Sequence, residues 1–295
     1  MEFVRAADWA QALAAKAALP EALPIQGGTD VMVELNFGRH RPVALLDLTG
    51  VAELGRWSGE PDGRLRVGAG VSYTRLIAEL GRQLPGLAQA ARTVGSPQIR
   101  NRATVGGNLG AASPAGDSHP PLLAAGAVIE VESAARGVRM IPAEEFYLGV
   151  KRNALQADEL IRAFWMRPAA GPQYFSKVGT RNAMVIAVCS FAVALDADRR
   201  RVGTGIGSAA PTPVRAVAAE EFVAAEADWD DERLDPGVLE RFGELASQAA
   251  APIDDVRGTA DYRRHALAVM ARRTLSWAWN ERNERWSRHG RREAI

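Results

Sequence analysis

Hydrophobic positions in the first fifty residues alternate between helix-like and strand-like patterns. The Ala-rich stretch 9–18 predicts a helix, and Asp8 in front of it is a suitable N-cap. A short apolar segment at 23–25 precedes a second predicted helix, which Gly38 ends, and the apolar run 43–48 predicts a strand. These elements predict a small α/β subdomain at the start of the chain.

The pattern that follows, up to about residue 169, predicts a second subdomain. Strands are predicted at 65–70, 127–131 and 159–166, and Ser72 can cap the first of the helices between them. The polar, Gly-rich stretch 95–117 shows neither the helical nor the strand period, and this predicts a long loop. Loops of this length inside a compact domain are usually functional.

Prolines and glycines between residues 168 and 172 indicate a domain boundary. Three strand-like segments beyond it predict an antiparallel meander, and three helical segments follow. The strands are 174–178, 185–195 and 201–207, and the helices lie near 217–225 and 238–250 and from 261 past 279. The chain is therefore predicted to comprise residues 1–169, with subdomains of about 1–52 and 53–169, then residues 170–282, then a charged and frayed tail, 283–295.

Composition narrows the classes of protein that the chain can belong to. Lys and Arg number 36 against 35 Asp and Glu, a net charge of +1, so no nucleic-acid partner is expected. No apolar run approaches the roughly 20 residues that span a bilayer, and no secretion signal is recognised, so a cytoplasmic protein is predicted. Cys189 is the only cysteine and lies in an apolar run, which predicts a buried thiol. An iron–sulfur cluster that needs several thiolates cannot be built here, and four scattered histidines predict no metal site.

Two glycine pairs are the main candidates for ligand binding. The sequence Q-G-G-T-D occupies residues 26–30, between a predicted strand and a helix, and T-V-G-G-N occupies residues 104–108, inside the predicted loop. Paired glycines allow a close backbone approach, and consecutive amides in such turns bind anions. Each pair could instead be an ordinary tight turn, and neither matches a P-loop or Rossmann motif. Two such turns in one α/β domain predict a dinucleotide whose diphosphate lies between two subdomains.

The segment 98–127, Q-I-R-N-R-A-T-V-G-G-N-L-G-A-A-S-P-A-G-D-S-H-P-P-L-L-A-A-G-A, resembles the central motif of the FAD-binding medium subunits of molybdenum hydroxylases. This family includes the carbon monoxide dehydrogenase medium chain and the flavin domain of xanthine dehydrogenase. Other motifs of the family occur along the chain in the family's order, and only about the last dozen residues fall outside the resemblance. They are Q-G-G-T-D, L-Q-A-D-E-L-I at 155–161, F-S-K-V-G-T-R-N-A-M-V-I-A at 175–187, A-A-P-T-P-V-R-A at 209–216 and I-D-D-V-R-G-T-A-D-Y-R-R-H at 253–265.

The resemblance implies an α+β fold. It consists of a two-subdomain FAD-binding fold of the PCMH or vanillyl-alcohol-oxidase type, followed by a C-terminal domain with a three-stranded antiparallel sheet and helices. The resemblance also implies a set of FAD-binding residues. The pyrophosphate is expected at Ile25, Gln26, Gly27, Gly28, Thr29 and Asp30 and at Thr104, Gly106, Gly107 and Asn108, and the ribityl and ribose region at Ser113 and Asp117.

Three further positions complete this set, and each has a simpler alternative. Leu155 and Ile161 are expected against the adenine or flavin rings, but they could belong to the hydrophobic core alone. Lys177 is expected near the isoalloxazine or its access channel, but it could be a solvated strand residue. Asp117 could cap the following helix, with or without binding FAD. No histidine follows Gly28 where a covalent flavin link would need one, so FAD is expected to bind non-covalently.

The resemblance implies a subunit that transfers electrons, with no catalytic acid or base and no metal of its own. Molybdopterin is expected on a large partner subunit and 2Fe–2S clusters on a small one, in a dimer of heterotrimers. This subunit would pass electrons to an external acceptor. Two alternatives remain at this stage: a stand-alone FAD-dependent oxidase or reductase, and a scaffold that retains the fold without the flavin. The intact glycine motifs argue against the scaffold.

Overall fold

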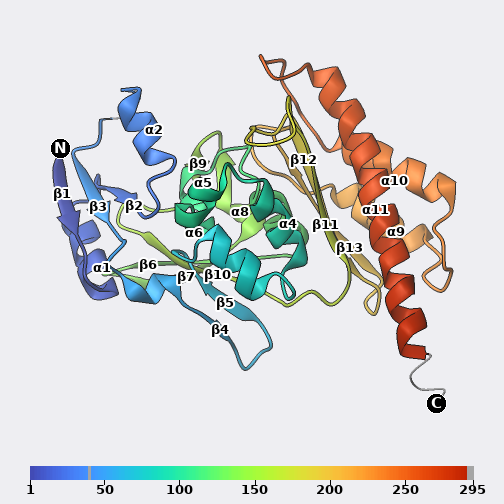
Figure 1. The fold of residues 1–295 in the computed structure, drawn as a ribbon, viewed down its shortest axis with the longest axis horizontal. Helices are drawn as coiled ribbons and strands as arrows, with labels where there is room; N and C mark the ends of the chain where they lie inside the picture. Colours follow the sequence, from blue (N-terminus) through green and yellow to red (C-terminus); the bar gives the residue numbers. More distant parts are fainter. Residues whose placement is uncertain (39–40, 291–295) are drawn as a thin grey trace.

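In the computed structural model of the chain, residues 1–38 and 41–290 are described, with side chains as far as Asn283. Three α/β layers follow one another along the longest axis of the molecule (Figure 1). The N-terminal layer contains a parallel sheet of order β1-β3-β2. Its elements are β1 (Glu2–Arg5), α1 (Trp9–Ala18), β2 (Leu23–Ile25), α2 (Val31–Asn36), β3 (Ala44–Asp47) and the 3-10 turn η1 (Ala52–Gly55).

The elements predicted for this first layer are present. Asp8 caps α1 by accepting a hydrogen bond from the Gln11 backbone amide, and Gly38 follows α2 with a φ of +64°. Strand β1 was not predicted, because its four residues are exposed or half-buried and show no period. It forms only by pairing with β3, a partner about forty residues away, in the register Glu2 to Ala44.

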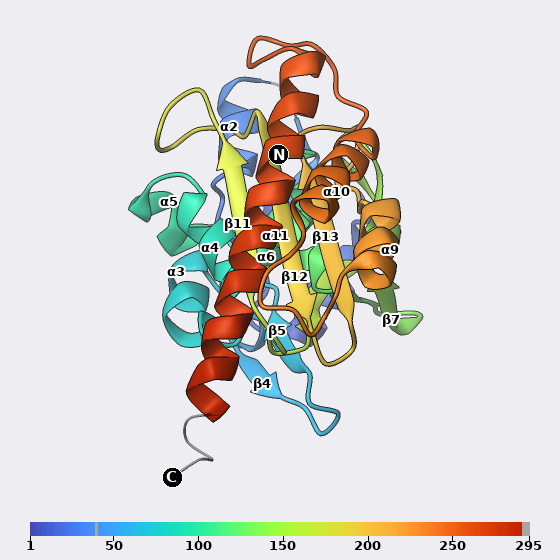
Figure 2. The same cartoon turned by 90° about the vertical axis from the view of Figure 1, so that its right-hand side faces the viewer.

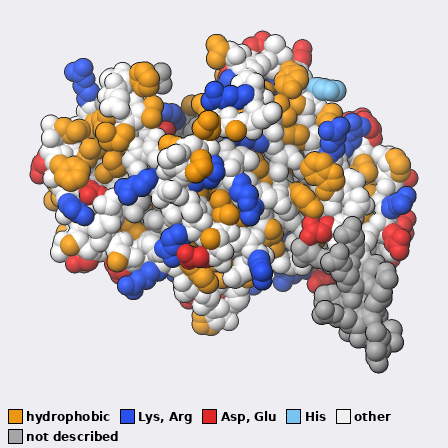
Figure 3. All heavy atoms as spheres, viewed as in Figure 1, with side chains coloured by type: hydrophobic (Ala, Val, Ile, Leu, Met, Phe, Trp, Pro, Cys, Tyr) orange, Lys and Arg blue, Asp and Glu red, His pale blue; other side chains and the backbone are white. Residues whose placement is uncertain are grey.

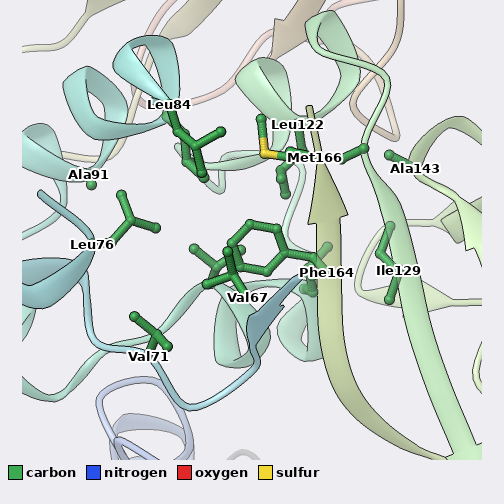
Figure 4. Close-up of a cluster of buried hydrophobic side chains, with 14 of the residues drawn as sticks. Val67, Val71, Leu76, Leu84, Ala91, Leu122, Ile129, Ala143, Phe164 and Met166 are labelled. Carbon is green, nitrogen blue, oxygen red and sulfur yellow. The ribbon is translucent and has the colours of Figure 1, made fainter. Parts of the chain in front are cut away.

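The middle layer contains an antiparallel sheet of order β4-β5-β10-β6-β7. Its strands are β4 (Trp57–Gly59), β5 (Leu65–Gly68), β6 (Val128–Ser133), β7 (Gly137–Pro142) and β10 (Leu160–Met166), and a small hairpin is formed by β8 (Tyr147–Gly149) and β9 (Arg152–Asn153). The helices are α3 (Tyr73–Arg75), its π-helical continuation η2 (Leu76–Leu80), α4 (Pro85–Thr93), α5 (Pro97–Arg102), α6 (Val105–Ala111), α7 (His119–Ala124) and α8 (Ala143–Phe146). Phe164 of the central strand β10 lies in one hydrophobic core with Val67 and with Leu122 of α7 (Figure 4).

The prediction of a long loop over residues 95–117 is wrong, because the segment contains helices α5 and α6. Each helix is initiated by a capping hydroxyl rather than by an apolar period. Ser96 accepts a hydrogen bond from the Ile99 amide, and Thr104 accepts one from the Gly107 amide. Helices of six and seven residues are too short to show the helical period clearly.

The C-terminal layer has the predicted antiparallel sheet, in the order β11-β12-β13. Its elements are β11 (Gln173–Val178), β12 (Cys189–Asp196), β13 (Arg201–Gly207), α9 (Val217–Glu226), α10 (Pro236–Gln248) and α11 (Ala260–Gly290). Helices α9, α10 and α11 cover the outer face of this sheet (Figure 2), and α4 and α7 contact its inner face. Strand β12 begins at Cys189, so residues 185–188 are not part of the strand as predicted.

Helix α11 continues to Gly290, past residue 283, where a frayed tail was predicted to begin. The last part of that predicted tail, residues 291–295, lies outside the described residues. The domain boundaries at residues 52, 169 and 282 stay predictions. Within the described residues, no helix is both long enough and apolar enough to cross a bilayer.

Alternate glycines in β13 bring the C-terminal sheet close to the middle layer. A Cβ atom at Gly203 would lie 2.0 Å from the Ala124 carbonyl oxygen, and one at Gly205 would lie 2.0 Å from the Pro120 carbonyl oxygen. Both carbonyls belong to α7. Strand and helix therefore touch backbone to backbone, which holds the side chains of β11 in a fixed place against the middle layer.

Cys189 lies in the C-terminal core, as its apolar neighbours predicted. The side chain is fully buried among the hydrophobic residues that join β12 to the helices. Burial raises the pKa of the Cys189 thiol to about 12. The thiol is therefore protonated and inaccessible at neutral pH.

Candidate functional site

A cavity of about 660 Å³ opens between the two N-terminal layers and extends to the C-terminal sheet. This volume lies within the range of about 300–1,000 Å³ that is usual for cofactor and ligand sites. The predicted FAD-binding residues, Ile25 excepted, all line it: Gln26, Gly27, Gly28, Thr29, Asp30, Thr104, Gly106, Gly107, Asn108, Ser113, Asp117, Leu155, Ile161 and Lys177. The Ile25 side chain lies behind the wall, 3.6 Å from where a Cβ of Gly28 would be.

The first glycine pair forms the turn from β2 into α2. Gly28 has a φ of +74°, a left-handed conformation that favours glycine. A Cβ at Gly27 would lie 2.1 Å from the Arg102 carbonyl oxygen at the end of α5. Gly27 is therefore needed to bring the turn of the first layer into contact with the second. Beside it, Gln26 Oε1 is buried and has no hydrogen-bond partner within the protein, so a donor on a bound ligand would satisfy it.

The second glycine pair forms the first turn of α6, and its two glycines have different structural roles. A Cβ at Gly106 would lie 2.5 Å from the carbonyl oxygen of Ala69, so this glycine is required for packing against the end of β5. A Cβ at Gly107 would meet only Thr104 Oγ1, at 3.2 Å. Gly107 is exposed and lines the cavity. Its missing side chain therefore leaves open space in the cavity itself.

A buried hydroxyl orients Asn108 at the cavity wall. Ser118 Oγ donates a hydrogen bond of 2.5 Å to Asn108 Oδ1, and Ser118 Oγ also lies 3.2 Å from the hydroxyl of Tyr73. Ser118 and Tyr73 are both buried. Because Oδ1 is already engaged, Asn108 presents its Nδ2 amide as a donor. Sequence reasoning did not find Ser118 or Tyr73, since neither stands in a glycine turn and only the fold brings them to Asn108.

An ion pair joins the FAD-binding layers to the C-terminal sheet at the cavity. Lys177 Nζ lies 2.6 Å from Asp117 Oδ2, and both side chains are less than a tenth exposed. The hydroxyl of Thr93 donates a hydrogen bond of 3.0 Å to the same oxygen. Burial raises the pKa of Asp117, and the nearby Lys177 ammonium opposes that rise. The second oxygen, Oδ1, is buried with no partner in the protein, so it can accept a ligand hydrogen bond.

Two of the simpler alternatives for these residues are wrong. Lys177 is not a solvated strand residue, because its side chain is only 9% exposed. Asp117 does not cap α7, because the N-cap position is Ser118 and no side-chain hydrogen bond caps that helix. Leu155 and Ile161 satisfy both interpretations, since they are half-buried against the core of the middle layer and also line the cavity.

Several residues that line the cavity were not predicted. The hairpin between β8 and β9 contributes Lys151, and helix α2 contributes Glu34. The segment before β12 contributes Val185 and Ile186, which belong to the motif 175–187 that the resemblance implied as the flavin-edge loop. Lys151 Nζ forms an ion pair with Glu34 across the cavity, over a separation of 117 residues. A lysine and a glutamate so far apart carry no local signal, so only the tertiary structure shows the pair.

The fold and the cavity define a class of protein. Two α/β layers face each other across glycine-rich turns, with open space at Gly107 and unsatisfied buried acceptors at Gln26 and Asp117. These features fit an elongated ligand with an anionic centre and several donor groups, and a dinucleotide has both. The site is thus that of a dinucleotide-binding subunit. Among the described residues, no group of three or more His, Cys, Asp or Glu side chains is placed to hold a metal ion.

The chain belongs to the family of FAD-binding subunits of molybdopterin dehydrogenases. Residues 1–166 match the FAD binding domain in molybdopterin dehydrogenase, and residues 174–278 match the CO dehydrogenase flavoprotein C-terminal domain. The xanthine dehydrogenase FAD-binding subunit of Escherichia coli is 33% identical over 283 residues, which cover 93% of this chain and 94% of that protein. The nicotine 6-hydroxylase medium subunit of Paenarthrobacter nicotinovorans is 29% identical, over 85% of this chain and 87% of its own length.

Solved structures agree with this assignment. The fold matches carbon monoxide dehydrogenase from Hydrogenophaga pseudoflava with a TM-score of 0.88 and 25% identity, over 95% of this chain and 98% of that chain. Quinoline 2-oxidoreductase from Pseudomonas putida matches with a TM-score of 0.85. The predicted family, the α+β fold with its three-stranded C-terminal sheet, the role as an oxidoreductase component and the FAD cofactor are confirmed. The individual contacts between residues and FAD stay predictions.

Proposed function

We propose that this chain is the electron-transfer subunit of a molybdenum hydroxylase, which takes electrons from 2Fe–2S clusters on a small partner subunit and passes them to an external acceptor. A large partner subunit would carry the molybdopterin and oxidise the substrate. Bound FAD supplies a redox centre that accepts electrons singly or in pairs. The names of relatives support a multi-subunit enzyme, since they include a medium subunit, a medium chain and a FAD-binding subunit. A dimer of heterotrimers in the cytoplasm is part of this proposal.

The observation that carries the proposal is the pair of glycine turns on either side of one cavity. Gly28 and Gly107 belong to different layers, and both line the space between them. The absence of side chains at these two positions would let a diphosphate approach the backbone of both turns closely and bridge the two layers. Thr104 contributes by capping α6 and thereby fixing the Gly107 amide. The work of these residues is to bind and orient the cofactor.

The other end of the cavity is formed in part by the C-terminal domain. Lys177 brings a buried positive charge to it, and Asp117 keeps that ammonium in place. Val185 and Ile186 add apolar surface there, which excludes water from a bound ring system. We propose that this end receives the isoalloxazine and that Leu155 and Ile161 pack against a ring of the cofactor.

Purification of the chain tests the FAD site directly. The expected result is a yellow protein that releases FAD, identified by chromatography, into the supernatant after acid precipitation. FAD that stays with the precipitate would show a covalent link and contradict the non-covalent attachment. A colourless chain that cannot be reconstituted with FAD would refute the proposal.

Co-purification from the native host separates a subunit from a stand-alone oxidase or reductase. The expected result is a complex that contains this chain, a molybdopterin subunit and an iron–sulfur subunit. Iron and molybdenum would then be found in the complex and absent from the isolated chain. Recovery of the chain alone, with full activity toward an organic substrate, would favour the stand-alone enzyme and overturn the proposed role.

A further inference from the structure

Helix α2 forms an outer wall of the cavity without being part of a core. Asp30, Val31 and Glu34 line the cavity, but α2 contains no buried residue. Met32 and Val33 are 44% and 46% exposed, and Figure 3 shows exposed hydrophobic side chains on the part of the surface that α2 forms. A helix of six residues is not stable on its own, and most helices in proteins are held by a packed face. The wall therefore has no fully buried face to hold it in place.

Glycines with left-handed backbones stand on both sides of this helix. Gly28 precedes it with a φ of +74°, and Gly38 follows it with a φ of +64°. A Cβ at Gly38 would meet no atom of the described residues within 4 Å. Glycines at the two ends of a short segment can absorb the dihedral changes of a rigid-body movement. The segment from Gly28 to Gly38 is thus built like a hinged flap.

The hairpin opposite α2 is fixed to the middle layer. The Lys151 backbone amide donates to the Ala112 carbonyl oxygen at 3.2 Å. Asn153 Nδ2 donates to the Gly110 carbonyl oxygen at 3.0 Å. Both acceptors lie at the end of α6, the helix that carries the second glycine pair. The hairpin therefore stays with α6 and the second glycine pair when α2 moves.

Lys151 links the fixed hairpin to the flap. Its ammonium pairs with the Glu34 carboxylate, and the side chains are 52% and 26% exposed. The Lys151 backbone has a φ of +54°, a left-handed conformation that is strained for a residue other than glycine. This conformation belongs to the tight turn between β8 and β9, which fixes where the side chain starts. Here the side chain reaches across the cavity to the helix on the other side.

We propose that Glu34 and Lys151 are positioning residues that latch α2 over bound FAD, and that FAD enters and leaves when this ion pair opens. The proposal rests on the proposed function, because it concerns the same cavity. The latch joins the two N-terminal layers, whereas the Asp117–Lys177 pair joins the FAD-binding domain to the C-terminal sheet. Opening at α2 therefore releases the cofactor without separating the domains.

The test measures the rate constant for FAD dissociation from the full chain, followed by the fluorescence of released FAD after dilution. Lys151→Met and Glu34→Gln are each expected to increase this rate constant about three- to fivefold, which is the effect of losing one partly exposed ion pair. The double variant is expected to match either single variant, because both remove the same interaction. The combined swap Glu34→Lys with Lys151→Glu is expected to restore a slow rate. High salt is expected to reduce the difference in dissociation rate constant between each single variant and the wild type.

A matched control removes an ion pair of similar exposure away from the cavity. Arg241 pairs with Glu244 on α10, with side chains that are 48% and 50% exposed. Arg241→Met removes one positive charge, as Lys151→Met does, and is expected to leave FAD dissociation unchanged. Hydrogen exchange provides a second measurement, since the amides of residues 31–37 are expected to exchange faster in Lys151→Met than in the wild type.

The signs of the effects separate the latch from direct contact between Lys151 and the cofactor. If Lys151 only attracted the FAD phosphates, Glu34→Gln would slow dissociation, because it removes a competing carboxylate. Opposite effects of Glu34→Gln and Lys151→Met would therefore overturn the latch, and so would unchanged dissociation in both variants. A chain that binds no FAD would overturn the proposed function together with the latch. Normal FAD binding with unchanged rates would overturn the latch alone.

Discussion

Lys177 Nζ in the C-terminal sheet lies 2.6 Å from Asp117 Oδ2 in the FAD-binding domain, and both side chains are almost completely buried. The pair comes together because glycines in β13 let that sheet approach α7 closely, just after Asp117 in the chain. A buried ion pair of this kind adds little to the stability of the folded protein, but removal of one partner is strongly destabilising. It therefore ties the geometry of the cavity to the contact between the two domains.

Lys177→Ala is expected to lower the free energy of unfolding by about 3 kcal/mol, because it leaves the Asp117 carboxylate buried without a cation. Urea denaturation of the chain measures this change. The double variant with Asp117→Asn is expected to recover most of the loss, since no charge then remains in the site. Equal destabilisation in the single and double variants would show that the unpaired Asp117 charge is not the cause of the loss.

The same Lys177→Ala variant tests the place of the flavin ring. In the fraction that remains folded and loaded with FAD, the rate of flavin reoxidation is expected to change more than the retention of FAD. The reason is that Lys177 lies at the end of the cavity that the C-terminal domain forms, away from the glycine turns. Stopped-flow reoxidation measures the effect, and an unchanged rate would refute the proposed position near the isoalloxazine.

Gly107→Val is expected to abolish FAD binding while the chain still folds. The new side chain meets only Thr104 Oγ1 within the protein and otherwise fills cavity space. Helix propensity changes little, because valine and glycine are both modest helix formers, within about 0.5 kcal/mol of each other. Gly59→Val is the control, since a Cβ there meets no atom within 4 Å and Gly59 lies outside the cavity. Flavin content and thermal unfolding are measured for both, and normal flavin occupancy in Gly107→Val would refute the site assignment.

Ser118→Ala is expected to raise the Kd for FAD about fivefold to tenfold, the loss expected from about 1 kcal/mol of binding free energy. The Ser118 hydroxyl orients the Asn108 amide by donating to its Oδ1, and without it Asn108 can rotate. Titration of the apo chain with FAD measures the change. Ser58→Ala removes a hydroxyl from the exposed strand β4, where it bonds Glu60, and is expected to have no effect. Unchanged affinity in Ser118→Ala would mean that Asn108 is held by other contacts.

Acid sensitivity is expected from His119, because burial lowers the pKa of this imidazole to about 3. Between the ordinary value of about 6.5 and that lowered value, the unfolded chain binds a proton that the folded chain does not. The free energy of unfolding is therefore expected to fall as the pH falls through this range, by up to about 1.4 kcal/mol per pH unit from this group.

Urea denaturation at several pH values measures that slope. In His119→Gln the slope is expected to be smaller by the contribution of one proton, although the variant is also less stable because the hydrogen bond with the Tyr147 hydroxyl is altered. His265→Gln is the control for a histidine-to-glutamine replacement at an exposed position. Identical slopes in His119→Gln and the wild type would assign the acid sensitivity to other groups.

The regular elements of the fold were predictable because they depend on local patterns. The run that contains Cys189 predicted a buried strand, and Asp8 and Ser72 predicted the caps that the structure shows. Strand β1 and helices α5 and α6 were missed for the opposite reason. Their residues have no periodic apolar face of useful length, and their conformation depends on pairing with β3 or on the caps at Ser96 and Thr104.

Residues of the candidate site were predictable only where they belong to a glycine pair or to a motif of the family. The turns at Gly28 and Gly107 could be found in this way, as could Asp117 and Lys177. Ser118 was not selected, because its role depends on a hydrogen bond to Asn108 that only the folded chain creates. The same holds for the Glu34–Lys151 pair, whose members are 117 residues apart.

The inert thiol of Cys189 makes this chain convenient for site-directed labelling. Its burial and its pKa of about 12 mean that maleimide reagents will not modify it in the folded protein. A cysteine introduced on α2, for example in place of Met32, would be the only reactive sulfhydryl in the native molecule. A spin label or fluorophore attached there would report the local mobility of α2, without any need for a cysteine-free background.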